Sequence, residues 1–213
     1  MTKAAPAFLI NGPKKAPLTI ALAHGAGAPM DTAFMNFFAE GLGEAGYRVA
    51  RFEFPYMAGR RADGKKRPPD RQPVLLETWQ SMIAALAPAP LVIGGKSMGG
   101  RMASLIAAGP DVPDHVKGLV CLGYPFYGAG RKDKPRTEHL KALPLPTLIC
   151  QGTRDPMGDR DTVKKLTLSH HIRIHWAEDG DHDLKPRKAS GRTADENWRE
   201  ALDAVTVFLS RLG

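Results

Sequence analysis

The sequence has few cysteines and no long apolar run. Cys121 and Cys150, its only two cysteines, lie within short apolar stretches typical of β-strands. They indicate small buried side chains in a reducing compartment and argue against a disulfide framework or a zinc site. The apolar run at residues 7–10 ends at once in Asn-Gly-Pro-Lys-Lys, and no stretch approaches the roughly 18–20 apolar residues that span a bilayer. We therefore expect a cytoplasmic protein without a membrane segment.

Aromatic residues are also scarce, at 7%, and no nucleic-acid-binding motif is recognisable, although the net charge is +8. The positive charge is concentrated in three segments. Residues 57–73 hold six basic and two acidic side chains, residues 131–141 hold five and two, and residues 185–192 hold four and none. Because this charge belongs to expected loops and the remainder is mildly acidic, we expect no nucleic-acid partner.

Short apolar runs alternate with helical patterns along the chain, which predicts an α/β fold with a mostly parallel sheet and helices on both faces. The length suits one domain over residues 1–213, with residues 1–17 as an extended lead-in or a short edge strand. We expect strands at 18–23, 48–54, 91–94, 118–122, 147–151 and 172–176, and helices at 32–44, 74–86, 97–107, 161–167 and 196–212. Asp31 or Thr32 is the expected cap of the first helix, and Asp195 of the last.

The segment GGKSMGGR at 94–101 follows an apolar strand and opens a helix. Gly95-Lys96-Ser97-Met98-Gly99 matches G-x-S-x-G, the nucleophile elbow. A serine at the apex of such a turn adopts a strained backbone conformation, and residues two before and two after it have no room for a Cβ. We therefore predict that Ser97 is a nucleophile, the alternative being a plain glycine turn.

A serine nucleophile needs a base that is oriented by an acid, and with this elbow the chain order is Ser, acid, His. Asp155 follows the strand expected at 147–151, and His182 lies in the loop after the strand at 172–176. We predict that Asp155 and His182 complete a catalytic triad with Ser97. The alternatives are a turn-forming aspartate before Pro156 and a solvated loop histidine.

An oxyanion hole needs two backbone N–H groups, and the residue after the nucleophile, Met98, supplies one. The second is expected from the loop His24-Gly25-Ala26-Gly27 after the first central strand. We assign it to Ala26, with Gly27 as the alternative. His24 is expected to brace this loop through a hydrogen bond.

These motifs resemble those of an α/β-hydrolase of the small, dienelactone-hydrolase-like kind. The segments HGAGAPMD, GGKSMGGRMAS, GYPFYGAG, QGTRDP and GDHDLK carry the resemblance over nearly the whole chain. It extends to a narrower group of bacterial hydrolase-like proteins and relatives of a subunit of a histone acetyltransferase complex. The resemblance implies an eight-stranded or trimmed sheet and the triad Ser97–Asp155–His182. Dienelactone hydrolases usually carry a cysteine where this chain has Ser97.

About 25 residues separate the strands expected at 118–122 and 147–151, too few for a large helical cap, so we expect an open site. Tyr124 and Phe126 follow a strand end and are candidates for an apolar wall, the alternative being core packing. Arg60 and Arg61 are candidates for a positive rim that attracts an anionic substrate, and Gly27 for a further substrate contact. Solvated loop charge is the alternative for the two arginines.

The function predicted from these residues is a serine hydrolase that acts on a carboxylic ester or thioester of a small, possibly anionic molecule. The expected mechanism passes through an acyl-enzyme and needs no metal or organic cofactor. The alternative is an interaction or scaffold protein of hydrolase fold with little or no turnover. An ester-type small molecule is the expected partner, and the oligomeric state is left open.

Overall fold

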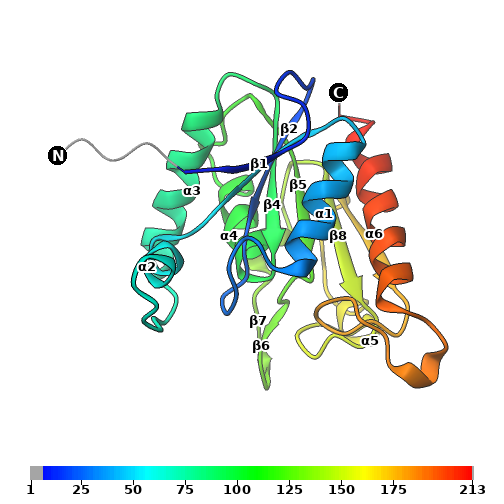
Figure 1. Ribbon diagram of the computed structural model, residues 1–213. Coiled ribbons are helices and arrows are strands. Elements are labelled where there is room, and N and C mark those ends of the chain that lie inside the picture. The colour runs from blue at the N-terminus through cyan, green and yellow to red at the C-terminus, as the bar shows by residue number, and fades with distance from the viewer. Residues whose placement is uncertain (1–6, 213) are drawn as a thin grey trace.

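One seven-stranded sheet forms the centre of the computed structural model, which describes residues 7–212 (Figure 1). The strand order is β1-β3-β2-β4-β5-β8-β9, and β1 pairs with β3 in the antiparallel sense whereas the other six strands run parallel. Residues 1–6 of the expected lead-in lie outside the described residues. The strands are β1 (Leu9–Asn11), β2 (Thr19–Ala23), β3 (Arg48–Phe52), β4 (Leu91–Lys96), β5 (Val116–Leu122), β8 (Thr147–Gly152) and β9 (Ile172–Ala177).

Helices cover both faces of this sheet, as the alternation of strands and helices predicts (Figure 1). Alternate side chains of the strands point to opposite faces. Ile20 and Leu22 of β2 pack in the cluster that contains the apolar faces of α1 and α6, whereas Ala21 and Ala23 belong to the cluster with α3 and α4. The helices are α1 (Ala33–Glu44), α2 (Pro55–Asp63), α3 (Gln72–Leu86), α4 (Met98–Ala107), α5 (Arg160–Val163) and α6 (Ala194–Leu209).

Helix α2 begins just before the first basic segment and includes residues 57–63 of it, which the sequence pattern assigned to a loop. Pro55 opens the helix, and Gly64 ends it in the left-handed conformation with φ 72°. Proline at the first position and glycine just past the end are ordinary helix-boundary signals. The apolar periodicity between them is weak, because only Tyr56 and Met57 are buried. For this reason, apolar periodicity does not predict this helix.

The capping residue of α1 agrees with the one expected from the sequence, whereas that of α6 differs. Thr32 caps α1 by accepting a hydrogen bond from the Met35 N–H, one of the two expected capping residues. The cap of α6 is Thr193 and not Asp195. Thr193 and Glu196 form a reciprocal capping box, and Asp195 lies in the first turn, where its negative charge interacts favourably with the helix dipole.

The segment between β5 and β8 carries no helical cap within the described residues. It contains the short hairpin of β6 (Tyr127–Gly128) and β7 (Arg131–Pro135), followed by the 3₁₀ turn Glu138–Leu140. The expectation of a minimal cap is confirmed. In residues 7–212, no helix has both the length and the apolar character needed to cross a membrane.

Candidate active site

Ser97 stands at the turn between β4 and α4 in a strained backbone conformation, with φ 50° and ψ −113°. The neighbouring glycines give the clearance that the motif requires. A Cβ on Gly95 would lie 2.1 Å from the Ala23 carbonyl oxygen, and a Cβ on Gly99 would lie 2.4 Å from the same atom. Gly95 also has a positive φ of 149°. The strand–turn–helix context expected of a nucleophile elbow is therefore present, and it projects the Ser97 side chain from the carboxyl end of β4.

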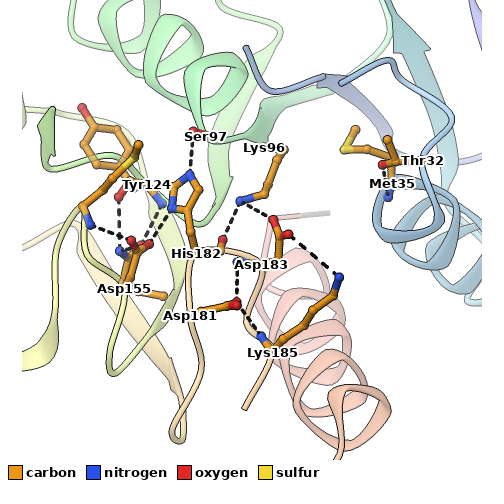
Figure 2. Close-up of polar contacts among 12 residues, drawn as sticks. Thr32, Met35, Lys96, Ser97, Tyr124, Asp155, Asp181, His182, Asp183 and Lys185 are labelled. Atoms are coloured by element: carbon orange, nitrogen blue, oxygen red, sulfur yellow. Dashed lines mark hydrogen bonds and ion pairs between the residues drawn. The ribbon is translucent and has the colours of Figure 1, made fainter. Parts of the chain in front are cut away.

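His182 links Ser97 to Asp155 through two hydrogen bonds (Figure 2). Its Nε2 lies 2.8 Å from Ser97 Oγ, and its Nδ1 lies 2.7 Å from Asp155 Oδ2. The three residues come from the ends of β4, β8 and β9, which are brought to one edge of the sheet by parallel pairing. In this arrangement Nδ1–H donates to the carboxylate, which leaves Nε2 free to accept the serine proton.

Asp155 is fully buried, and two further donors hold its carboxylate in place. The Met157 N–H donates to Oδ1 at 2.8 Å, and Gln151 Nε2 donates to Oδ2 at 2.8 Å. The Gln151 amide also exchanges hydrogen bonds with both backbone groups of Tyr124, so it joins the ends of β5 and β8. In the sequence, Gln151 is the polar residue at the end of an otherwise apolar strand and the first residue of the segment QGTRDP, but no motif gives it a role.

Lys96 precedes the serine and is buried, with 8% of its surface exposed. Its ammonium is not solvated but lies over the Phe34 ring, 5.4 Å from the ring centroid. The Lys96 ammonium donates to the main-chain carbonyl of His182 and pairs with Asp183 at 3.2 Å (Figure 2). Burial lowers the pKa of Lys96, and the Asp183 carboxylate opposes that shift. The lysine thus fastens the loop that carries His182 to the end of β4.

The loop from His24 to Ala28 lies beside Ser97, and buried hydrogen bonds brace it. His24 Nδ1 lies 2.7 Å from the Gly25 carbonyl, and its Nε2 accepts from the Phe54 N–H at 3.1 Å. The Tyr56 hydroxyl donates to the Ala26 carbonyl at 2.8 Å. Burial lowers the pKa of His24, which favours the neutral ring that these bonds require. His24 has the bracing contacts that the sequence predicted for it.

The two backbone N–H groups proposed for an oxyanion hole belong to residues beside Ser97. Met98 is the first residue of α4, so its N–H has no partner within the helix. Ala26 lines the same cavity as Ser97 and Met98, and no backbone acceptor for its N–H is present in residues 7–212. Both N–H groups are therefore available to a ligand atom.

Two cavities flank Ser97, and Ser97, Ala26 and Met157 line both of them. The first, of about 350 Å³, lies on the α4 side, and Arg101, Met102 and Arg136 contribute to its wall. The second, of about 420 Å³, lies toward α1 and α6 and is lined by Gly27, Phe34, Met35, Trp198 and His182, among others. An extended substrate could place its reacting carbonyl at Ser97 with one half in each cavity.

Four expected substrate contacts lie outside both cavities. Tyr124 and Phe126 are each 0% exposed and pack in the core, where their rings meet at 4.8 Å. Arg61 is turned away by bonds to Glu53 and Asp31, and Arg60 does not line either cavity. Of the five substrate contacts expected from sequence, Gly27 alone lines one of these two cavities.

Within residues 7–212, no group of three or more His, Cys, Asp or Glu side chains is arranged to hold a metal ion. Both cysteines are buried and unpaired, and burial raises the pKa of Cys150 to about 12. A thiol with so high a pKa is neither a nucleophile nor a metal ligand at neutral pH.

Comparisons with known proteins agree with this fold. A family model described as an alpha/beta hydrolase domain matches residues 16–210. One similar solved structure is an esterase domain from Rhodothermus marinus (14% identity, covering 98% of this chain and 94% of the other, TM-score 0.68). Another is an alpha-beta serine hydrolase homologue from Coxiella burnetii (17% identity, covering 97% of this chain and 91% of the other, TM-score 0.70). A dienelactone hydrolase from Anabaena variabilis is also similar (20% identity, covering 95% of this chain and 88% of the other, TM-score 0.68). With the parallel sheet and the elbow in place, the chain belongs to the alpha/beta hydrolase family.

Proposed function

We propose that this protein is a serine-dependent hydrolase that cleaves a carboxylic ester or thioester of a small molecule. One observation carries the proposal: a single imidazole bonds both Ser97 Oγ and the buried carboxylate of Asp155. Such a relay is what converts a weakly nucleophilic hydroxyl into an attacking group. The fold-level similarity to an esterase domain and to a serine hydrolase homologue is consistent with this chemistry.

In the proposed reaction, Ser97 Oγ attacks the acyl carbonyl while His182 Nε2 takes the hydroxyl proton. Asp155 holds the imidazole in the required tautomer and stabilises the imidazolium. The N–H groups of Met98 and Ala26 donate to the oxyanion. Collapse of the tetrahedral intermediate breaks the bond to the leaving group, which takes the proton from His182. Water, deprotonated by His182, then attacks the acyl-enzyme and regenerates the free Ser97 hydroxyl.

Labelling by a fluorophosphonate probe and hydrolysis of 4-nitrophenyl acetate, each compared between wild type and Ser97→Ala, test this proposal. We expect wild type to be labelled and to hydrolyse the ester, and Ser97→Ala to lose both activities. Circular dichroism establishes that both proteins are folded. If folded wild type gives neither signal, the esterase function is refuted and an interaction protein of hydrolase fold becomes the better explanation.

A further inference from the structure

The cavity on the α4 side of Ser97 contains an arginine without a protein partner. Arg101 lies in the first turn of α4 and lines this cavity together with Ser97 and Arg136. Its Nε is buried and makes no hydrogen bond, and no ion pair to its guanidinium is present within residues 7–212. Arg51 also has a buried Nε without a hydrogen bond, but its other guanidinium nitrogens donate to Met30 and to two asparagine side chains, and no such bond from Arg101 is present within residues 7–212. Arg101 is therefore a half-buried cation at the wall of the cavity, with a buried Nε that no group within residues 7–212 satisfies.

Three positive features meet in this cavity, which makes the lack of a partner costly. Burial lowers the pKa of the Arg101 guanidinium, and the neighbouring positive charge of Arg136 lowers it further. A cation in the first turn of a helix also opposes the helix dipole. A buried charged donor that is left unpaired costs more free energy than a neutral one. Each of these costs is relieved when an anion binds between the arginines.

No carboxylate within residues 7–212 forms an ion pair with Arg101. Asp70 is the one carboxylate among the residues that line this cavity, and it accepts a hydrogen bond from the Tyr56 N–H at 2.9 Å. It makes no ion pair with Arg101. The other cavity differs, because both of its lysines, Lys96 and Lys185, pair with Asp183. Each cavity is lined by two arginine or lysine side chains and one carboxylate, but that carboxylate pairs with both cations in the second cavity and does not pair with Arg101 in the first.

We propose that Arg101, assisted by Arg136, binds a carboxylate carried by the substrate, so that the preferred substrate is an ester with an ionised carboxylate on one half. The guanidinium fork suits a planar carboxylate, which can accept two parallel hydrogen bonds. The other half of the molecule enters the apolar cavity beside Phe34 and Trp198. This inference rests on the proposed hydrolase function, because it places the carboxylate relative to a carbonyl at Ser97.

Two pairs of esters test the proposal, because either half of the substrate could carry the charge. 4-Nitrophenyl hydrogen glutarate is compared with 4-nitrophenyl valerate, and 4-acetoxybenzoate with its methyl ester. Background rates measured with Ser97→Ala are subtracted. In at least one pair, the ratio of kcat/KM for the anionic to the neutral ester should fall about 30-fold in Arg101→Gln. Arg101→Lys, which keeps the charge and loses the fork, should give a smaller fall.

Arg131→Gln is the matched control, because it removes one positive charge from the exposed β7 strand, where Arg131 lies near Asp133. Its ratio should stay within twofold of wild type. Arg136→Gln should lower the ratio by about threefold to tenfold, since this exposed arginine is screened by solvent. A change of less than threefold in both ester pairs for Arg101→Gln overturns the proposal, provided that circular dichroism shows a folded protein.

A binding measurement separates this inference from the hydrolase function itself. Glutarate is titrated by NMR into Ser97→Ala and into the double variant Ser97→Ala/Arg101→Gln, with glutaramide as the neutral probe. We expect glutarate to bind the single variant and the Kd to rise at least tenfold in the double variant. If glutarate does not bind up to 50 mM, or if both variants bind it equally, the carboxylate subsite is refuted whether or not wild type hydrolyses esters.

Discussion

The strand ends and the basic segments lie at the same edge of the sheet, yet their polar side chains are held in different ways. At the strand ends, Asp155, Gln151 and Lys96 are buried, and each bonds to a group from another strand end or from the loop that follows it. In the basic segments, Arg61, Lys132 and Arg187 are exposed and pair with acidic residues close by. The buried residues at the strand ends position His182 and Ser97, whereas the exposed basic residues are neutralised by the carboxylates beside them.

The difference follows from solvent access. A buried polar group without a partner loses its hydration at a cost in free energy, so most buried polar groups at the strand ends are hydrogen-bonded. An exposed pair gains little, because water and salt screen it. Arg187 illustrates the local character of such pairs: it lowers the pKa of the Asp179 carboxyl to about 2 through direct hydrogen bonds, while 63% of its own side-chain surface remains exposed. Substitutions at the strand ends should therefore have larger effects than those in the basic segments.

The largest effect on activity after loss of the serine is expected for Asp155→Asn. An amide can accept or donate toward His182 Nδ1, and donation would stabilise the wrong imidazole tautomer. We expect kcat for 4-nitrophenyl acetate to fall about 10³- to 10⁴-fold, with a smaller change in KM. Steady-state kinetics measures this. A decrease of less than tenfold would mean that Asp155 does not orient the base.

The largest effect on stability is expected for Gly95→Ala. The new Cβ would lie 2.1 Å from the Ala23 carbonyl oxygen of the adjacent strand, in a backbone with positive φ. Steric overlap and backbone strain together should cost more than about 3 kcal/mol in the free energy of unfolding, measured by urea denaturation. Gly27→Ala is the control, since no atom lies within 4 Å of its Cβ position. Equal losses in the two variants would contradict the steric argument.

A moderate effect is expected for Lys96→Met, which keeps the buried stem and removes the ammonium. The carbonyl of His182 loses its donor and the loop loses its tie to β4. We expect kcat to fall about tenfold while KM changes little, because the lysine positions His182. Lys188→Met, an exposed substitution in the third basic segment, is the control. If KM rises and kcat is unaffected, Lys96 acts on substrate binding and not on the base.

The smallest effect is expected for Arg61→Gln. Its side chain is 47% exposed, and it pairs with Asp31 and with the largely buried Glu53. We expect a loss of about 1 kcal/mol in the free energy of unfolding, and a smaller loss in high salt. The anionic-to-neutral ratio of ester hydrolysis should stay as in wild type. A clear decrease in that ratio would show that Arg61 contributes to substrate binding, which would contradict the contrast between strand ends and basic segments.

Much of the fold and the candidate triad could be predicted from local sequence. The elbow has a short-range steric signature, and Asp155 and His182 each follow an apolar strand in the expected order. Roles that depend on distant partners could not be predicted. In the sequence, Gln151 is an ordinary polar residue, and its role depends on the pairing of β5 with β8 through the sheet. Tyr124 is a candidate site residue in the sequence, but the structure buries it in the core. Helix α2 was missed because its boundary signals are clear but its buried face is small.

The sequence by itself determined which residues stand at the strand ends, since apolar periodicity and glycine sterics act over a few residues. Tertiary structure alone decided which charges have partners. Arg61 and Arg101 are the same residue type at the same edge of the sheet, yet Glu53 and Asp31 pair with the first, and no carboxylate of residues 7–212 pairs with the second. Electrostatic pairing depends on distances through space that no local pattern encodes. The guanidinium left unpaired beside Ser97 is therefore a property of the folded protein.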